Sequence, residues 1–182
     1  MTTDTMHRRL GITRWVLLAM LALASGFAPS RALAADSLGF TLATLDGHAF
    51  VRLSDFPNRL VLINVWGTEC PPCMKETPLL NAQSQIYRNV QFLGIGTDDR
   101  ISSLLFASRY HVSYPQLQAP KDPDGLLRKL GDPHGALPFT VVLDTQHRIC
   151  AQRMGEVDAQ WIATAVRDCT AKAQADGSRE LK

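Results

Sequence analysis

The segment that most constrains the fold is a continuous apolar run that leads directly into two cysteines. The run is RLVLINVW, residues 59–66, and GTECPPC follows it at residues 67–73. An unbroken apolar stretch of this length is typical of a β-strand that is buried on both faces. Apolar residues then recur at helical spacing from Cys70 to about Asn89. We therefore expect a central buried strand that ends where Cys70 begins a helix.

Turn-forming residues divide the rest of the chain into short elements. In chain order we expect a hairpin around residues 46–47, a buried strand at 90–96, a helix at 101–110, an extended segment at 113–120, a short helix at 122–132, a hairpin at 138–155 and an amphipathic helix at 158–173. This order predicts an α/β fold with a mixed central β-sheet, an added N-terminal hairpin and helices on both faces.

The N-terminal segment, residues 1–34, has the pattern of a secretory signal peptide. Arginines precede the apolar stretch 15–24, and Ala32-Leu33-Ala34 offers a cleavage site. The apolar stretch is shorter than the ~20 residues that span a bilayer, although a retained anchor stays an alternative. We expect residues 35–172 to form the folded domain and residues 173–182 to form a flexible tail.

The positive charge of the chain belongs to this N-terminal segment. The whole chain has 19 Lys+Arg against 17 Asp+Glu, and residues 1–34 hold four of the arginines and one of the aspartates. The remaining chain therefore has 15 basic against 16 acidic residues. Such a balance offers no basic surface, so we expect no nucleic-acid partner.

The two close cysteines, Cys70 and Cys73, lie at the expected start of a helix. A helix N-terminus presents free amides and a partial positive charge, which stabilise a thiolate. Cys70 would be the exposed attacking thiol, and Cys73, one turn into the helix, would be the resolving thiol. The spacing therefore predicts a redox-active dithiol.

Two other interpretations of this cysteine pair are weaker. A zinc site needs two further ligands at suitable spacing, whereas Cys150 and Cys169 are 19 residues apart and no histidine pair is close in sequence. A purely structural disulfide across two residues would remove little entropy from the unfolded chain. We therefore expect no metal site.

The second cysteine pair is a candidate structural disulfide. Cys150 lies in the expected C-terminal hairpin, and Cys169 continues the apolar stripe of the last helix. A bridge between them would close a loop of about 19 residues, worth ~3 kcal/mol in the chain-entropy model. Two buried free cysteines are the alternative.

Two longer motifs occur in the chain, LDGHAFVRLSDFPNRLVLINVWGTECPPCMKETPLL at residues 45–80 and GALPFTVVLD at residues 135–144. Together they resemble the exported thioredoxin-like proteins of the TlpA, ResA and DsbE type, in the AhpC/TSA branch of the thioredoxin superfamily. The resemblance covers about residues 37–170 and implies a thioredoxin-like fold.

The resemblance also implies a substrate-aligning loop opposite the cysteines. Pro138 would be a cis-proline that faces Cys70, the alternative being an ordinary trans-proline at a strand start. It would expose the backbone of Leu137 for pairing with an extended substrate. Trp66 is expected to pack beside this site.

Two polar residues are implied to manage the proton of Cys73. Asn64 stands where general thioredoxins carry a buried acid. Glu76 lies one turn after Cys73 and would shuttle its proton, the alternative being a solvated glutamate on the helix surface.

Three residues next to Cys70 are expected to make the dithiol reducing. Pro71 and Pro72 lack N–H groups, so the sulfur of Cys70 receives few amide hydrogen bonds. Glu69 adds a like charge that disfavours the thiolate, and it replaces the tryptophan that is common in the family. A poorly stabilised thiolate favours a reductant over an oxidant.

The sequence thus predicts a periplasmic thiol-disulfide oxidoreductase that reduces protein disulfides, either free after signal cleavage or anchored to the inner membrane. By resemblance, its clients would serve cytochrome c maturation or oxidase copper-site assembly, and a membrane-embedded donor would supply electrons. No cofactor is expected beyond the Cys70–Cys73 disulfide, and membrane contact only if the N-terminal segment is retained. The alternative function is a Cu(I)-binding metallochaperone that uses the same cysteines. The sequence leaves the oligomeric state open.

Overall fold

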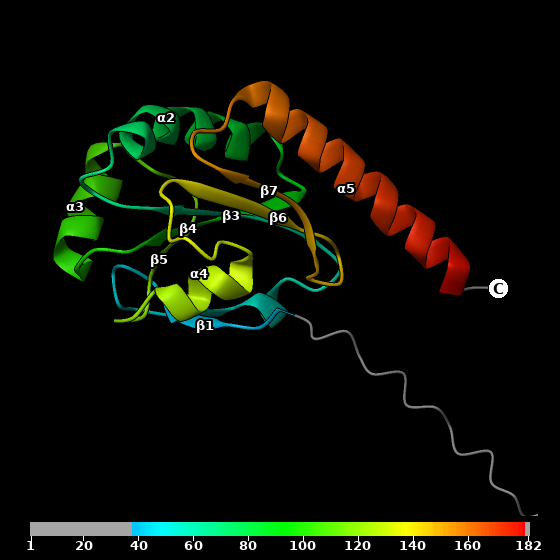
Figure 1. Cartoon of the computed structure of the whole chain (residues 1–182), viewed down its shortest axis with the longest axis horizontal. Coiled ribbons are helices and arrows are strands. Elements are labelled where there is room, and N and C mark those ends of the chain that lie inside the picture. The colour runs from blue at the N-terminus through cyan, green and yellow to red at the C-terminus, as the bar shows by residue number, and fades with distance from the viewer. Residues whose placement is uncertain (1–37, 181–182) are drawn as a thin grey trace, which may run out of the picture. The chain divides into compact units, whose positions relative to one another are not determined.

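The computed structural model describes residues 38–180, so the predicted signal segment lies outside the described residues. Five strands form the central sheet in the order β5-β4-β3-β6-β7 (Figure 1). All seven residues of the central strand, β3, are buried, as its unbroken apolar run predicts. The bounds of the strands are β3 Leu60–Trp66, β4 Val90–Gly96, β5 Gln116–Gln118, β6 Phe139–Leu143 and β7 Ile149–Met154.

The strand directions make this sheet mixed. β4 runs parallel to β3 and β5 parallel to β4, whereas β6 is antiparallel to β3 and β7 to β6. The register places Asn64 of β3 beside Thr140 of β6. β5 adds an edge strand where the sequence indicates only an extended segment.

Helices cover both faces of the sheet, as predicted (Figure 1). α2 and α5 pack on one face, whereas α4 and the β1–β2 hairpin pack on the other. α3 contacts the edge strand β5. The bounds of these elements are β1 Thr41–Ala43, β2 Phe50–Arg52, the 3-10 helix η1 Leu53–Asp55, α2 Pro71–Ile86, α3 Arg100–Arg109, α4 Asp124–Leu130 and α5 Ala159–Glu180.

The last helix is longer than expected. Residues 173–180 continue α5 to its end at Glu180, whereas the sequence predicts a flexible tail there. The physical reason lies in Arg148, whose guanidinium forms ion pairs with Asp144 after β6 and with Asp176 in the last turns of α5. These contacts hold the helix end to the sheet.

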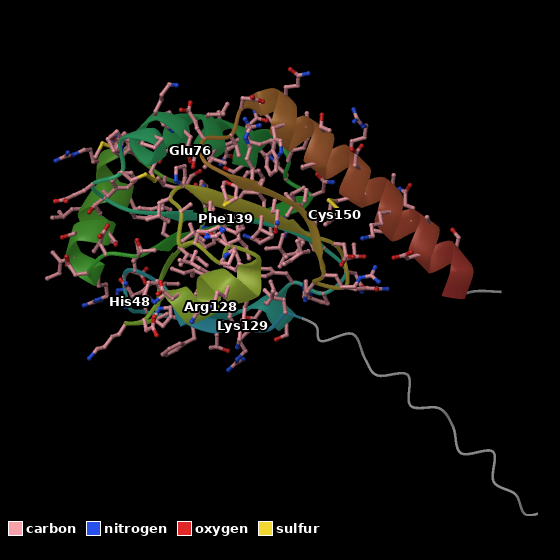
Figure 2. The ribbon with its side chains drawn as sticks, in the orientation of Figure 1. His48, Glu76, Arg128, Lys129, Phe139 and Cys150 are labelled. Atoms are coloured by element: carbon pink, nitrogen blue, oxygen red, sulfur yellow. A yellow bond between two sulfur atoms is a disulfide. The ribbon has the colours of Figure 1, made fainter. Side chains whose placement is uncertain are left out.

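A disulfide also joins α5 to the sheet (Figure 2). It links Cys150 of β7 to Cys169, which is fully buried. The structure therefore bonds this pair, where the sequence leaves open a disulfide or two free thiols.

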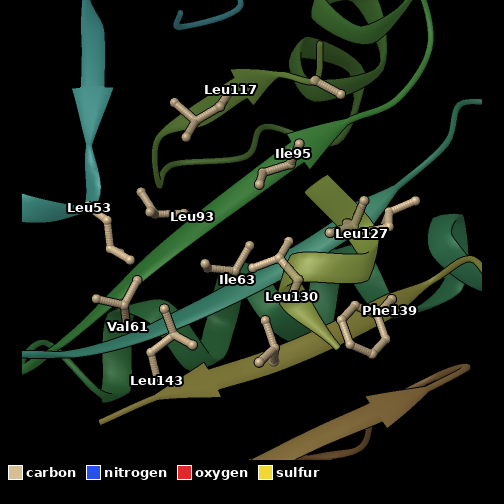
Figure 3. Close-up of a cluster of buried hydrophobic side chains, with 13 residues drawn as sticks. Leu53, Val61, Ile63, Leu93, Ile95, Leu117, Leu127, Leu130, Phe139 and Leu143 are labelled. Carbon is tan, nitrogen blue, oxygen red and sulfur yellow. The ribbon is translucent and has the colours of Figure 1, made fainter. Parts of the chain in front are cut away.

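The core divides into two layers because side chains of β3 alternate between the two faces of the sheet. Val61, Ile63 and Val65 point toward α4, whereas Leu60 and Leu62 point toward α2 and α5. Figure 3 shows the first layer, to which other elements contribute Leu53, Leu93, Ile95, Leu117, Leu127, Leu130, Phe139 and Leu143. β3 is thus packed between two apolar layers, which fix the position of its C-terminal end in the centre of the sheet.

Candidate active site

The two cysteines lie just after β3, at the start of α2. Cys70 is the N-cap residue of α2, and prolines 71 and 72 begin the helix. Proline suits these positions because its φ is already helical and the first helical amides have no partner within the helix. The C-P-P-C sequence therefore favours a helix that begins directly after Cys70.

Cys70 and Cys73 form a disulfide whose two sulfurs differ in accessibility. Cys73 is fully buried, whereas Cys70 is partly exposed. An incoming thiolate therefore meets Cys70 first. This asymmetry is the one that an attacking and a resolving cysteine require.

The prolines limit hydrogen bonding to the Cys70 sulfur. Within the described part of the chain, this sulfur accepts one hydrogen bond, from the backbone N–H of Cys73 at 3.2 Å. Pro71 and Pro72 have no N–H to offer. Because such bonds stabilise a thiolate, the Cys70 thiolate gains little beyond the helix N-terminus and this single amide.

Glu69 is exposed to solvent. Water and salt screen an exposed charge, so its repulsion of a Cys70 thiolate is weak. The structure therefore gives Glu69 less influence on the thiol than its position in the sequence suggests.

The loop before β6 faces the active-site helix. The Leu137–Pro138 peptide bond is cis, and the carbonyl oxygen of Pro138 accepts a hydrogen bond from the N–H of Gly155 at 2.8 Å. Leu137 is half-buried and packs in the same apolar cluster as Cys70 and Cys73. The structure thus has the predicted cis-proline and places Leu137, the residue before it, in the cluster of the cysteines.

Glu76 lies one turn after Cys73 and is buried, not solvated on the helix surface (Figure 2). Its Oε1 accepts a hydrogen bond from Nδ2 of Asn64 at 2.7 Å, and its Oε2 accepts one from the N–H of Val157 at 2.9 Å. Burial raises the pKa of Glu76 to about 6, although both hydrogen bonds act to lower it. Residues three apart on a helix are neighbours, so this carboxyl lies within reach of the Cys73 side chain.

Asn64 connects Glu76 to the strand that follows Pro138. Its Nδ2 also donates to Oγ1 of Thr140, at 3.0 Å. Thr140 belongs to the second motif, but its contact with Asn64 had no signal in the sequence. Val157 had none either, because it contributes only a backbone amide. The sequence pattern therefore indicates neither the Thr140 partner of Asn64 nor the Val157 partner of Glu76.

Trp66 packs beneath the site and presents no exposed docking surface. It is buried, and its ring stacks on Phe106 with the ring centroids 4.5 Å apart. Its Nε1 donates to Oε1 of Gln116 at 3.0 Å. Trp66 therefore fixes the end of β3 against α3 and β5.

Within residues 38–180, no group of three or more His, Cys, Asp or Glu side chains is arranged to hold a metal ion. None of the helices in this range has the length and hydropathy of a transmembrane span.

Comparisons with known proteins show the family to which the chain belongs. Residues 34–165 match the AhpC/TSA family. The thiol:disulfide interchange protein DsbE of Pseudomonas fluorescens biotype C is 31% identical over 131 residues, which are 71% of each chain. The thiol-disulfide oxidoreductase ResA of Geobacillus kaustophilus is 37% identical over 79 residues, a match that spans 42% of this chain and 45% of that relative.

A solved structure supports the same relationship. A secreted thiol-disulfide isomerase from Corynebacterium glutamicum is 27% identical and superposes with a TM-score of 0.61 over 70% of this chain and 80% of its own. The predicted thioredoxin-like fold is thereby confirmed. The chain belongs to the AhpC/TSA family, and it is a thiol-disulfide oxidoreductase related to ResA and DsbE.

Proposed function

We propose that this protein is an exported reductase of protein disulfides. The observation that carries the proposal is the buried Glu76, whose pKa is raised to about 6 and which lies one turn from the resolving cysteine, Cys73. A group with that pKa is mostly ionised near pH 7, so it can take a proton from the buried thiol.

Reduction proceeds in two exchange steps. The Cys70 thiolate attacks one sulfur of the client disulfide, forms a Cys70–client mixed disulfide and releases the other client sulfur as a thiolate. Cys73 passes its proton to Glu76, and its thiolate then attacks the sulfur of Cys70. The Cys70–Cys73 disulfide forms, the second client sulfur leaves as a thiolate, and two electrons have moved to the client. The two client thiolates take up protons from Glu76 and from water.

The surroundings of Cys70 favour the direction of this reaction. The sulfur accepts one amide hydrogen bond, from Cys73, because the two intervening residues are prolines. A strong oxidant instead depends on a highly stabilised thiolate in its reduced form. A dithiol with so little stabilisation gives up its electrons more readily.

The proposal also includes the client proteins, the electron donor and the cellular compartment. By the family resemblance, the clients serve cytochrome c maturation or oxidase copper-site assembly. By the same resemblance, a membrane-embedded electron donor reduces the Cys70–Cys73 disulfide again. Export to the periplasm is supported by the signal pattern of residues 1–34, by two disulfides and by a structural neighbour that is secreted.

A Cys73→Ser variant tests the mechanism in the native compartment. Without the resolving thiol, the variant is expected to accumulate a Cys70–client mixed disulfide, which appears as a higher band on non-reducing gels and disappears with dithiothreitol. The control is Cys70→Ser with Cys73 intact, which should trap nothing because Cys73 is buried. Absence of any adduct with Cys73→Ser would refute the mechanism.

A second assay separates reduction from copper handling by the same cysteines. The wild-type protein, reduced by dithiothreitol, should accelerate the precipitation of insulin chains, and Cys70→Ser should not. Stoichiometric Cu(I) binding that survives a competing chelator, without insulin reduction, would favour the metallochaperone instead.

A further inference from the structure

The loop that precedes Cys70 is anchored by an aspartate from another strand connection. Asp98 follows β4 and is partly buried. Its Oδ2 accepts a hydrogen bond from the N–H of Thr68 at 2.5 Å, two residues before Cys70. Its backbone oxygen accepts a second one from Nε2 of Gln118 at 2.8 Å. Asp98 is therefore fixed at its backbone and at its carboxylate.

The same loop is closely packed at Gly67. A Cβ atom added at Gly67 would lie 3.2 Å from Cδ1 of Leu137 and 3.5 Å from Oδ2 of Asp98. Both the residue that precedes the cis-proline and the carboxylate of Asp98 therefore lie close to Gly67. Loss of either neighbour would give the residues before Cys70 room to move.

Three carboxylates lie near this loop, and they are held in different ways. Glu69 is exposed. Asp99 is also exposed and caps α3, where its side chain accepts hydrogen bonds from two amides of the first turn. Asp98 is partly buried, and its carboxylate accepts a hydrogen bond from the Thr68 amide of the loop. Since consecutive Cα atoms are ~3.8 Å apart, its Oδ2 lies within ~12 Å of the Cys70 backbone.

We propose that Asp98 is a positioning residue for Cys70: it anchors the 67–69 loop and holds a fixed negative charge within ~12 Å of the Cys70 backbone. A fixed and partly buried charge is screened less than an exposed one. It therefore disfavours the Cys70 thiolate and favours the disulfide form of the pair, the effect expected of Glu69 from the sequence. The inference rests on Cys70 being the attacking cysteine of the proposed reductase.

Two substitutions separate the charge from the anchor. Asp98→Asn keeps an acceptor for the Thr68 amide and removes the charge, whereas Asp98→Ala removes both. The first readout is the rate at which iodoacetamide alkylates Cys70 in the reduced protein, followed by peptide mapping across a range of pH. For Asp98→Asn we expect this rate to rise about twofold near pH 7, as for two unit charges ~10 Å apart in water.

The second readout is the reduction of a protein disulfide. Asp98→Ala should lower kcat/KM for insulin about tenfold relative to Asp98→Asn, because a mobile loop no longer holds Cys70 in one place. Circular dichroism confirms the fold, and Asp98→Asn alone still tests the charge if Asp98→Ala is unfolded. Asp99→Asn is the matched control, because it removes the neighbouring exposed charge and keeps a cap; both rates should stay at wild-type values.

Two results would overturn the proposal. Equal alkylation rates in Asp98→Asn and Asp99→Asn would show that the charge of Asp98 does not act on Cys70. Equal kcat/KM for Asp98→Ala and Asp98→Asn would show that the anchor is dispensable. Alkylation needs no client, so it reports on Asp98 even if the protein proves not to be a reductase.

Discussion

The buried carboxyl of Glu76 makes a quantitative prediction about stability. Its pKa rises from 4.5 to about 6 on folding, which means that the folded state holds this proton more tightly than the unfolded state. The penalty for burying the group is therefore absent below about pH 4.5 and fully present above about pH 6. At 1.36 kcal/mol per pKa unit, the free energy of unfolding should fall by ~2 kcal/mol as the pH rises through this window.

Glu76→Gln removes this titration and keeps the size of the side chain. The assay is urea unfolding of the oxidised protein at several pH values between about 4 and 8, followed by circular dichroism. The difference in free energy of unfolding, wild type minus variant, should decrease by ~2 kcal/mol from about pH 4.5 to pH 7. The other titratable groups are the same in both proteins, so their contributions cancel in this difference.

Glu156→Gln is the control for this experiment. Glu156 is partly exposed and pairs with Lys75 at 2.8 Å. Its charge also contributes to raising the pKa of Glu76, so the pH-dependent step should persist in this variant and shrink slightly. Parallel wild-type and Glu76→Gln curves would refute the assignment of a raised pKa to Glu76.

Three further predictions concern the surroundings of the site. Asn64→Asp replaces a hydrogen-bond donor by a like charge, which should raise the pKa of Glu76 further and move the pH midpoint of insulin reduction upward; an unchanged midpoint would contradict the contact. Paired alanines at Cys150 and Cys169 should lower the free energy of unfolding by ~3 kcal/mol and leave insulin reduction intact, and a loss below ~1 kcal/mol would refute a stabilising bridge. Arg148→Ala should speed hydrogen exchange in the last two turns of α5, whereas unchanged exchange would show that its ion pairs do not hold the helix end.

The centre of the fold can be predicted from the sequence because the residue types of β3 and of the start of α2 suit the structures that they form. The apolar run before the cysteines has the length and composition of a buried strand, and the prolines after Cys70 suit the first positions of a helix. The edge strand β5 and the last turns of α5 escape prediction. β5 is three residues long with two glutamines, and α5 contains Gly177, which normally disfavours a helix and is here offset by ion pairs to the sheet.

The electrostatics of the site depend on contacts that residue types do not reveal. In TDD, residues 97–99, one aspartate caps α3 and the other turns to the Thr68 amide, and the pattern alone does not tell them apart. Glu69 carries the right charge at the right position, yet it is exposed. The pKa of Glu76 depends on its burial and on the amide of Val157, which is 81 residues away along the chain.

The partners of Glu76 also limit how this chemistry can be transplanted. A helix that carries C-P-P-C-M-K-E brings its own cysteines and acid to a new scaffold. The hydrogen-bond donors that lower the pKa of the acid come from β3, through Asn64, and from the turn before α5, through Val157, and the rest of the fold buries it. A graft of the helix alone should therefore yield a dithiol with an ordinary surface glutamate, whereas a graft that carries all three segments should reproduce the proton acceptor.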